Sequence, residues 1–83
     1  MTVDDAAKIL SKMYLQAEPK EKVVQIHLFG IKFAEQIKHM SPAEIAVRAD
    51  LPKTYGTEIN KARNLARYVI LKPSLGDACS DHI

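Results

Sequence analysis

The sequence predicts an all-α protein, a single small domain built as a bundle of four helices. The chain has 83 residues, of which 47% are apolar, so it is long enough for one domain with a hydrophobic core. Apolar residues recur every three or four positions in successive stretches, which is typical of amphipathic helices. Proline and capping residues separate these stretches from one another. We therefore expect a helical domain over residues 1–72 and a flexible C-terminal tail over residues 73–83.

The first predicted helix covers roughly residues 3–15, where the apolar residues lie at helical spacing. The hydroxyl of Thr2 can cap this helix by accepting the backbone N–H of Asp5. Pro19 ends it, because the residue before a proline is forced out of helical geometry.

The second predicted helix, Lys20–Lys38, has the longest apolar pattern. Apolar side chains cover much of the circumference in the middle of this helix, which is typical of a helix that is central to its domain or buried on two sides. Because a second subunit could cover the second side, we expect a homodimer through this helix, at about residues 20–38. Gly30 lies within the pattern and costs about 1 kcal/mol relative to alanine. It indicates a close crossing by another helix, or a bend or break.

The third predicted helix begins with the sharpest local signal in the chain. Ser41 is the expected N-cap, Pro42 takes the first helical position, and Glu44 is placed to complete a capping box with Ser41. This helix is short, because the run Asp50-Leu51-Pro52 ends it.

The fourth predicted helix begins at Lys53 or Thr54 and continues to about residue 69. The β-branched and aromatic residues at positions 68–71 favour a short extended segment after it. Pro73 ends the regular structure.

Together, the third and fourth helices have the outline of a helix-turn-helix, a unit whose second helix can lie in the major groove of DNA. Ala46 and Ala49 are small, so the second helix can approach the first. Leu51 can lock the turn to the core, and Ile59 and Ala62 can anchor the second helix. The predicted fold is therefore an all-α, four-helix bundle of the helix-turn-helix type.

Three residues depart from the usual helix-turn-helix pattern. Asp50 occupies the turn position that is often glycine, although aspartate tolerates left-handed backbone better than most residues. Gly56 weakens the start of the second helix, but it allows the backbone to approach DNA or the preceding helix closely. Glu58 adds a negative charge near the expected phosphates.

Basic residues are concentrated in this part of the chain. Residues 48–72 contain six Lys and Arg and two acids, which gives a net charge of +4, and they include all three arginines of the chain. Lys and Arg can contact phosphate or guanine, and Asn can contact adenine. The residues predicted to bind double-stranded DNA face outward from the second helix of the unit or lie beside that face: Lys53, Tyr55, Thr57, Asn60, Lys61, Arg63, Asn64 and Arg67.

Two runs of sequence carry a family resemblance: IHLFGIKFAEQI at residues 26–37 and TYGTEINKARNLARYVILK at residues 54–72. Nearly all of residues 1–72 resembles the small bacterial HTH-like domains that occur as short stand-alone proteins. The resemblance implies a helix-turn-helix-like fold and a role in DNA binding. Since a fold alone does not define a function, it implies no particular DNA sequence.

Other kinds of site have little support in the sequence. The three histidines, His27, His39 and His82, lack the spacing of metal ligands, and the chain has no nucleophile elbow and no Gly-rich phosphate loop. We therefore expect no metal, no cofactor and no enzymatic activity. Cys79 is the single cysteine and cannot form an internal disulfide. No apolar run approaches the roughly 20 residues that span a bilayer, so we expect a soluble cytoplasmic protein with no membrane segment.

Two alternatives to DNA binding stay open at this point. A protein–protein interaction module could use the same helix-turn-helix shape without binding DNA, and a small-ligand or enzymatic role is the third hypothesis. The salt dependence of DNA binding distinguishes the first hypothesis from the other two, because contacts with phosphates weaken steeply as salt is added.

Overall fold

The computed structural model describes residues 1–73, so residues 74–83 of the predicted tail lie outside the described part of the chain. Its helices are α1 (Val3–Gln16), α2 (Lys22–Lys32), α3 (Pro42–Arg48) and α4 (Tyr55–Leu65), with two 3-10 turns, η1 (Pro19–Glu21) and η2 (Ala66–Tyr68). Residues 1–73 contain no β-strand. The all-α, four-helix fold is therefore confirmed. None of these helices has the length and apolar character needed to cross a membrane.

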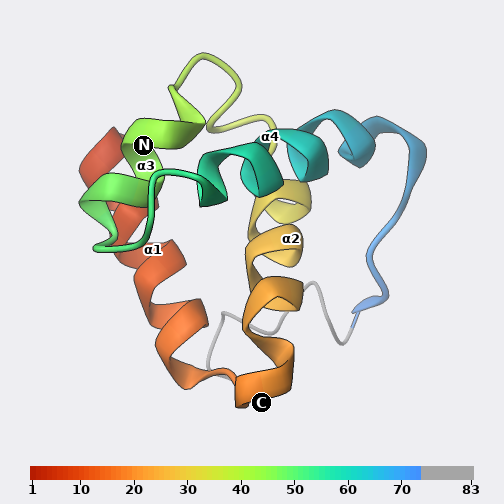
Figure 1. Ribbon diagram of the computed structural model, residues 1–83. Coiled ribbons are helices and arrows are strands. Elements are labelled where there is room, and N and C mark those ends of the chain that lie inside the picture. Colours follow the sequence, from red (N-terminus) through yellow and green to blue (C-terminus); the bar gives the residue numbers. More distant parts are fainter. Residues whose placement is uncertain (74–83) are drawn as a thin grey trace.

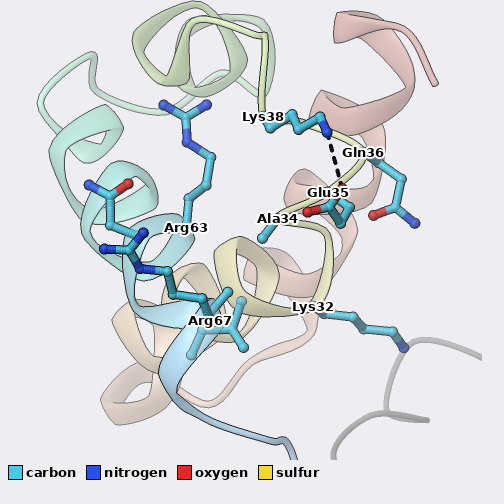
Figure 2. Close-up of a pocket in the computed structure, with 10 residues that line it drawn as sticks. Lys32, Ala34, Glu35, Gln36, Lys38, Arg63 and Arg67 are labelled. Carbon is cyan, nitrogen blue, oxygen red and sulfur yellow. Dashed lines mark hydrogen bonds and ion pairs between the residues drawn. The ribbon is translucent and has the colours of Figure 1, made fainter.

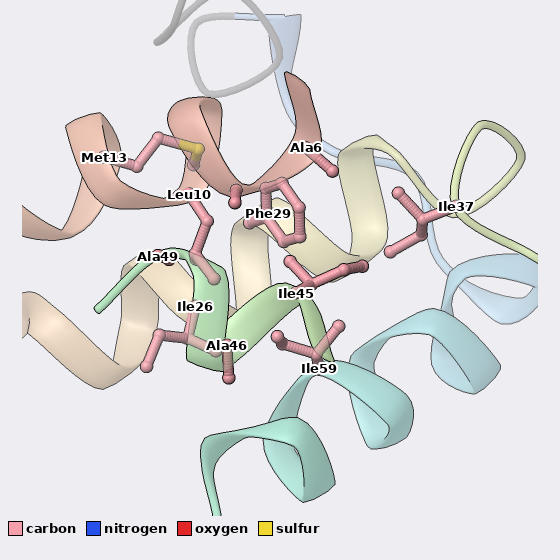
Figure 3. Close-up of a cluster of buried hydrophobic side chains, with 11 residues drawn as sticks. Ala6, Leu10, Met13, Ile26, Phe29, Ile37, Ile45, Ala46, Ala49 and Ile59 are labelled. Atoms are coloured by element: carbon pink, nitrogen blue, oxygen red, sulfur yellow. The ribbon is translucent and has the colours of Figure 1, made fainter. Parts of the chain in front are cut away.

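Helices α1 and α2 lie side by side and are joined through η1, while α3 and α4 lie at the other end of this pair (Figure 1). Helix α4 packs mainly on α2 and on α3. The core lies where the four helices meet, and its largest fully buried side chains come from all of them and from the turns after α2 (Figure 3): Leu10, Ile26, Phe29, Ile37, Ile45 and Ile59. This shared core fixes the position of α4 in the domain.

The N-terminus of α1 is capped as the sequence predicts. The Thr2 hydroxyl accepts the backbone N–H of Asp5 at 3.1 Å, and the Asp5 carboxylate accepts the backbone N–H of Thr2 at 3.1 Å. These hydrogen bonds hold the pKa of Asp5 below its usual value, with the bond from the Thr2 backbone as the largest cause. The helix therefore begins with a complete capping box.

The predicted helix over Lys20–Lys38 is too long, because α2 ends at Lys32 and the chain continues as hydrogen-bonded turns. Two features explain this early end. Ile37 turns back into the core, where it is fully buried. The Arg63 guanidinium donates to the carbonyl oxygens of Ile37 and Met40, both at 2.9 Å, and satisfies them in place of a continued helix.

The predicted start of α3 is correct in position, but its hydrogen bonding differs from the predicted capping box. The Ser41 hydroxyl accepts the Glu44 backbone N–H at 3.3 Å, so the N-cap is confirmed. The predicted capping box is wrong, because the Glu44 carboxylate turns to the guanidinium of Arg48 at 2.6 Å instead of to the Ser41 backbone. A charged partner one turn along the helix competes successfully for the carboxylate.

The turn after α3 takes the left-handed conformation expected at Asp50, whose φ is 65°. The Asp50 N–H donates to the Val47 carbonyl at 3.0 Å, and the Leu51 N–H donates to the Ala46 carbonyl at 2.9 Å. These two bonds form a Schellman motif, which satisfies the last carbonyls of the helix. Leu51 then packs against the core, as the sequence predicts.

The fourth helix ends earlier than predicted. The sequence indicated a helix at residues 54–69, whereas α4 ends at Leu65 and η2 tightens the chain before Val69 takes an extended conformation. The extended backbone at Val69 agrees with the predicted change of structure after the last helix.

Candidate nucleic-acid interface

Helix α4 is held against its neighbours at two points where glycine allows close approach. A Cβ atom at Gly30 of α2 would lie 2.6 Å from the Cβ of Ala62 and 2.9 Å from the Ile59 carbonyl oxygen. A Cβ atom at Gly56 would lie 2.7 Å from the backbone of Ala43 in α3. Both contacts are shorter than side chains normally tolerate. Gly56 therefore serves the approach of α4 to α3, one of the two roles that the sequence left open.

The outward side of α4 presents a row of polar side chains. Gly56, Ile59 and Ala62 are buried, and the exposed residues lie three or four positions apart on the opposite side of the helix. We call these exposed residues the α4 face: Thr57, Asn60, Lys61 and Asn64. The sequence predicted all four of them as DNA-binding residues.

Lys53 extends the α4 face at its N-terminal end. It is exposed in the turn before α4 and lines a shallow pocket of about 590 Å³ together with Thr57 and Asn60. Ser41 and Ala43 form the α3 side of the same pocket. The start of α3 and the start of α4 thus open onto one surface.

Tyr55 lies away from the α4 face. Its half-buried ring packs against Tyr14 of α1, with ring centroids 6.1 Å apart. Hydrogen bonding with Tyr55 is the largest cause of a raised pKa at Tyr14. The structure thus places Tyr55 in a contact between α1 and α4.

Arg63 also has structural partners. Its Nη1 atom donates to the carbonyls of Ile37 and Met40, and its Nη2 atom donates to the Asn60 side-chain oxygen at 2.8 Å. The sequence gave no sign of this role, because the two carbonyls lie 26 and 23 residues earlier in the chain. Arg63 thus holds the segment between α2 and α3 against α4.

Arg67 lies in η2, beyond the end of α4, and its side chain is exposed. Its Nη2 atom donates to the Tyr68 hydroxyl at 2.8 Å, and its guanidinium lies 4.9 Å from the centroid of the Tyr68 ring. Arg67 thus continues the line of the α4 face toward the C-terminal end of the helix.

Glu58 is an acidic residue of α4 itself, and its carboxylate contacts two side chains. His27 of α2 lies 2.8 Å from Oε1, and Lys61 lies 3.7 Å from Oε2. The hydrogen bond from His27 is the largest cause that lowers the pKa of Glu58 below 4.5. Since half-exposed Glu58 is bound from both sides, it opposes an incoming phosphate less than an unpaired carboxylate would.

Arg48, the remaining arginine of the basic segment at residues 48–72, is neutralised by carboxylates. Arg48 donates to Asp4 at 2.8 Å and to Glu44 at 2.6 Å. Asp4 lies 44 residues away in the sequence, so counting charges in a window of sequence could not detect the first of these pairs. Arg48 consequently adds little to the positive potential around α4.

Residues 1–73 contain no group of three or more His, Cys, Asp or Glu side chains arranged to hold a metal ion.

Comparison with known proteins identifies a family for this chain. The model of a protein family described as an HTH-like domain matches residues 2–72. No curated protein and no solved structure matches the chain.

Proposed function

The chain belongs to the HTH-like domain family, and on that premise we propose that it binds double-stranded DNA with α4 in the major groove. The observation that carries the proposal is the α4 face, a row of exposed Thr, Asn and Lys side chains on a helix that the core holds firmly. A helix of 11 residues is about 16 Å long, which suits insertion into the major groove.

Within this face, Asn64 is the best candidate to recognise a base. In residues 1–73 its side-chain amide has no hydrogen-bond partner, so its oxygen and its NH₂ group are both available for the bidentate contact that adenine accepts. Asn60 is more constrained, because Arg63 already donates to its oxygen. We infer that Asn64 contributes more to sequence recognition than Asn60.

Lys53, Lys61 and Arg67 would supply phosphate contacts along this surface. Three such contacts predict a slope of about −2.7 for log K against log salt. Binding should therefore weaken about 40-fold between 50 and 200 mM salt. A surface that does not bind DNA would show no such dependence.

The experiment is fluorescence anisotropy with a labelled mixed-sequence duplex at 50, 100 and 200 mM salt. Lys61→Ala should weaken binding and reduce the magnitude of the slope by about 0.9, without lowering the melting temperature. Lys20→Ala is the matched control, since this exposed lysine lies in η1, at the end of the molecule away from α4 (Figure 1). Absence of binding at 50 mM salt, or a flat salt response, would reject the proposal.

A docking site for a protein partner is the second candidate function, and one observation favours it. Large apolar side chains are exposed just beyond the polar α4 face: Leu65 is 47% exposed, Tyr68 is 70% exposed and Ile70 is 96% exposed. These residues are close in the sequence, and contiguous exposed apolar surface is typical of interaction sites. Substituting Tyr68 and Ile70 with Ser should abolish such docking but leave the contacts of Lys61 with DNA intact.

The homodimer also stays a proposal, and the exposure of the side chains of α2 supports one side of this helix as its surface. Ile26 and Phe29 of α2 are fully buried in the domain's own core, whereas Val23 and Val24 are 43% and 41% exposed. A dimer through α2 would therefore use the side that carries these two valines. Analytical ultracentrifugation of Val23→Glu beside the wild-type protein tests this surface.

A further inference from the structure

A groove of about 770 Å³ lies beside α4, between its last turns, η2 and the turns that follow α2 (Figure 2). Arg63 and Arg67 come from the α4 side, and Lys38 and Glu35 come from the turns on the other side. Lys32 also lines the groove. Among the described residues that line it, four cationic side chains and one carboxylate give a formal charge of +3.

The positive charge of the two arginines is not cancelled inside the domain. Within residues 1–73, neither Arg63 nor Arg67 has a carboxylate partner; they bind carbonyl, amide and hydroxyl oxygens instead. Glu35 is the one acid among the described residues that line the groove; it lies 3.3 Å from Lys38, in a pair whose side chains are 86% and 54% exposed. Such an exposed pair is weak, so Lys38 can exchange this partner for another anion.

Arg63 is held in place yet keeps hydrogen-bond donors for a ligand. A guanidinium has five N–H donors, and three of those of Arg63 are used by Ile37, Met40 and Asn60. The carbonyl contacts fix the guanidinium plane, which reduces the entropy lost when a ligand binds. Arginines with lysine nearby are the side chains that best match phosphate oxygens.

The groove is continuous with the α4 face. Asn64 belongs to both surfaces, and Arg67 lies where one passes into the other. When a helix lies in the major groove, the sugar-phosphate backbones run along both of its sides. We propose that this groove binds a phosphate of the DNA backbone flanking the base pairs that α4 contacts. The inference rests on the proposed DNA binding, and it adds Lys38 and Arg63 as a phosphate site outside the α4 face.

The experiment measures two variants in the anisotropy assay. One removes a positive charge from the groove, and the other removes a negative charge. Lys38→Gln should weaken binding about fivefold or more at 100 mM salt and reduce the magnitude of the salt slope by about 0.9, equally for duplexes of different sequence. Glu35→Gln should strengthen binding, because it removes the only carboxylate among the described residues that line the groove. A purely structural role of the Lys38–Glu35 pair would move both variants in the same direction, which would overturn the inference.

Two further comparisons separate this inference from the proposed function. If Lys61→Gln weakens binding while Lys38→Gln matches the wild type, α4 binds DNA but the groove does not hold a phosphate. If the wild-type protein binds no duplex at 50 mM salt, both proposals fail together. Lys20→Gln serves as the neutral control for the loss of one lysine charge.

Nuclear magnetic resonance of the arginine Nε–H groups locates the contact directly. Adding duplex should shift the signals of Arg63 and Arg67 and leave that of Arg48, which is paired with carboxylates, unchanged. Inorganic phosphate at an equal concentration of phosphate groups should shift them much less. Equal shifts with inorganic phosphate would indicate a site for a free anion, and would overturn the assignment to the DNA backbone.

Discussion

Replacing Gly30 with alanine tests the close crossing that positions α4. The new Cβ would lie 2.6 Å from the Ala62 Cβ and 2.9 Å from the Ile59 carbonyl oxygen, whereas carbon atoms normally pack at about 3.5–4.0 Å. Neither obstacle is the flexible end of a long side chain. Helix α2 or helix α4 must therefore move by several tenths of an ångström.

The expected cost follows from two opposing effects. Overpacking a core typically costs about 1–3 kcal/mol, and replacing glycine with alanine inside a helix returns about 0.8–1.0 kcal/mol. Because the closest contacts at Gly30 involve a short side chain and backbone, the packing cost should lie in the upper part of its range. We expect Gly30→Ala to lower the free energy of unfolding by about 1–2 kcal/mol, which corresponds to a fall in melting temperature of roughly 5–15 °C.

Thermal and urea denaturation followed by circular dichroism measure this change. Val24→Ala, at a partly exposed position of the same helix, is the control for a substitution in α2 away from the crossing. In the double variant with Ala62→Gly, the nearest clashing atom is removed, so the combined loss should be smaller than the sum of the two single losses. If Gly30→Ala is as stable as the wild type and the double variant is additive, the crossing is not as close as the structure indicates.

The remaining predictions concern caps, the turn and acid titration. Ser41→Ala removes the cap on the Glu44 backbone N–H and should lower the free energy of unfolding by about 1 kcal/mol in urea denaturation; no change would mean that the cap is replaced by water. Asp50→Ala should cost about 1 kcal/mol, because Asp50 has a φ of 65°, while Asp50→Gly should be at least as stable as the wild type, and the reverse order would contradict the left-handed turn. Glu58→Gln tests the bond with His27: since the folded pKa of Glu58 lies below 4.5, the carboxylate stabilises the fold above that pH and loses its contribution as the pH falls through the folded pKa. The wild type should thus melt at a higher temperature than Glu58→Gln at pH 6, and this difference should disappear in acid. A difference that increases in acid would contradict a stabilising role of the ionised carboxylate.

Local signals in the sequence predicted the parts of the fold that depend on neighbouring residues. Thr2 and Ser41 are N-caps because the hydroxyl of each accepts the backbone N–H of the residue three positions later, which has no partner within the helix. Asp50 takes left-handed backbone because the short polar side chain tolerates it after a helix end. These features need information from only a few consecutive residues, so a single sequence was sufficient.

Contacts between distant parts of the chain account for what the sequence could not predict. The apolar pattern of α2 continues beyond Lys32, but Ile37 is drawn into the core and Arg63, 26 residues later, satisfies its carbonyl. The same bond turns the Arg63 guanidinium toward the turns after α2, so the DNA contact proposed for Arg63 lies in the groove and not on the α4 face. Periodicity records which residues are apolar, but it does not record which element they will face.

The distribution of positive charge also depends on contacts between distant residues, and it indicates which cations of the candidate interface are available to DNA. The sequence places three arginines in one basic window, but Arg48 is bound by two carboxylates, while Arg63 and Arg67 have none within residues 1–73. The uncancelled arginine charge therefore gathers at the C-terminal half of α4, beside Asn64 and the groove. At the N-terminal end, Lys53 lines the pocket beside the start of α4. A DNA backbone would then be held most strongly near the end of α4, so loss of Arg67 should weaken binding more than loss of Lys53, and the reverse result in the anisotropy assay would place the main phosphate contacts at the start of the helix.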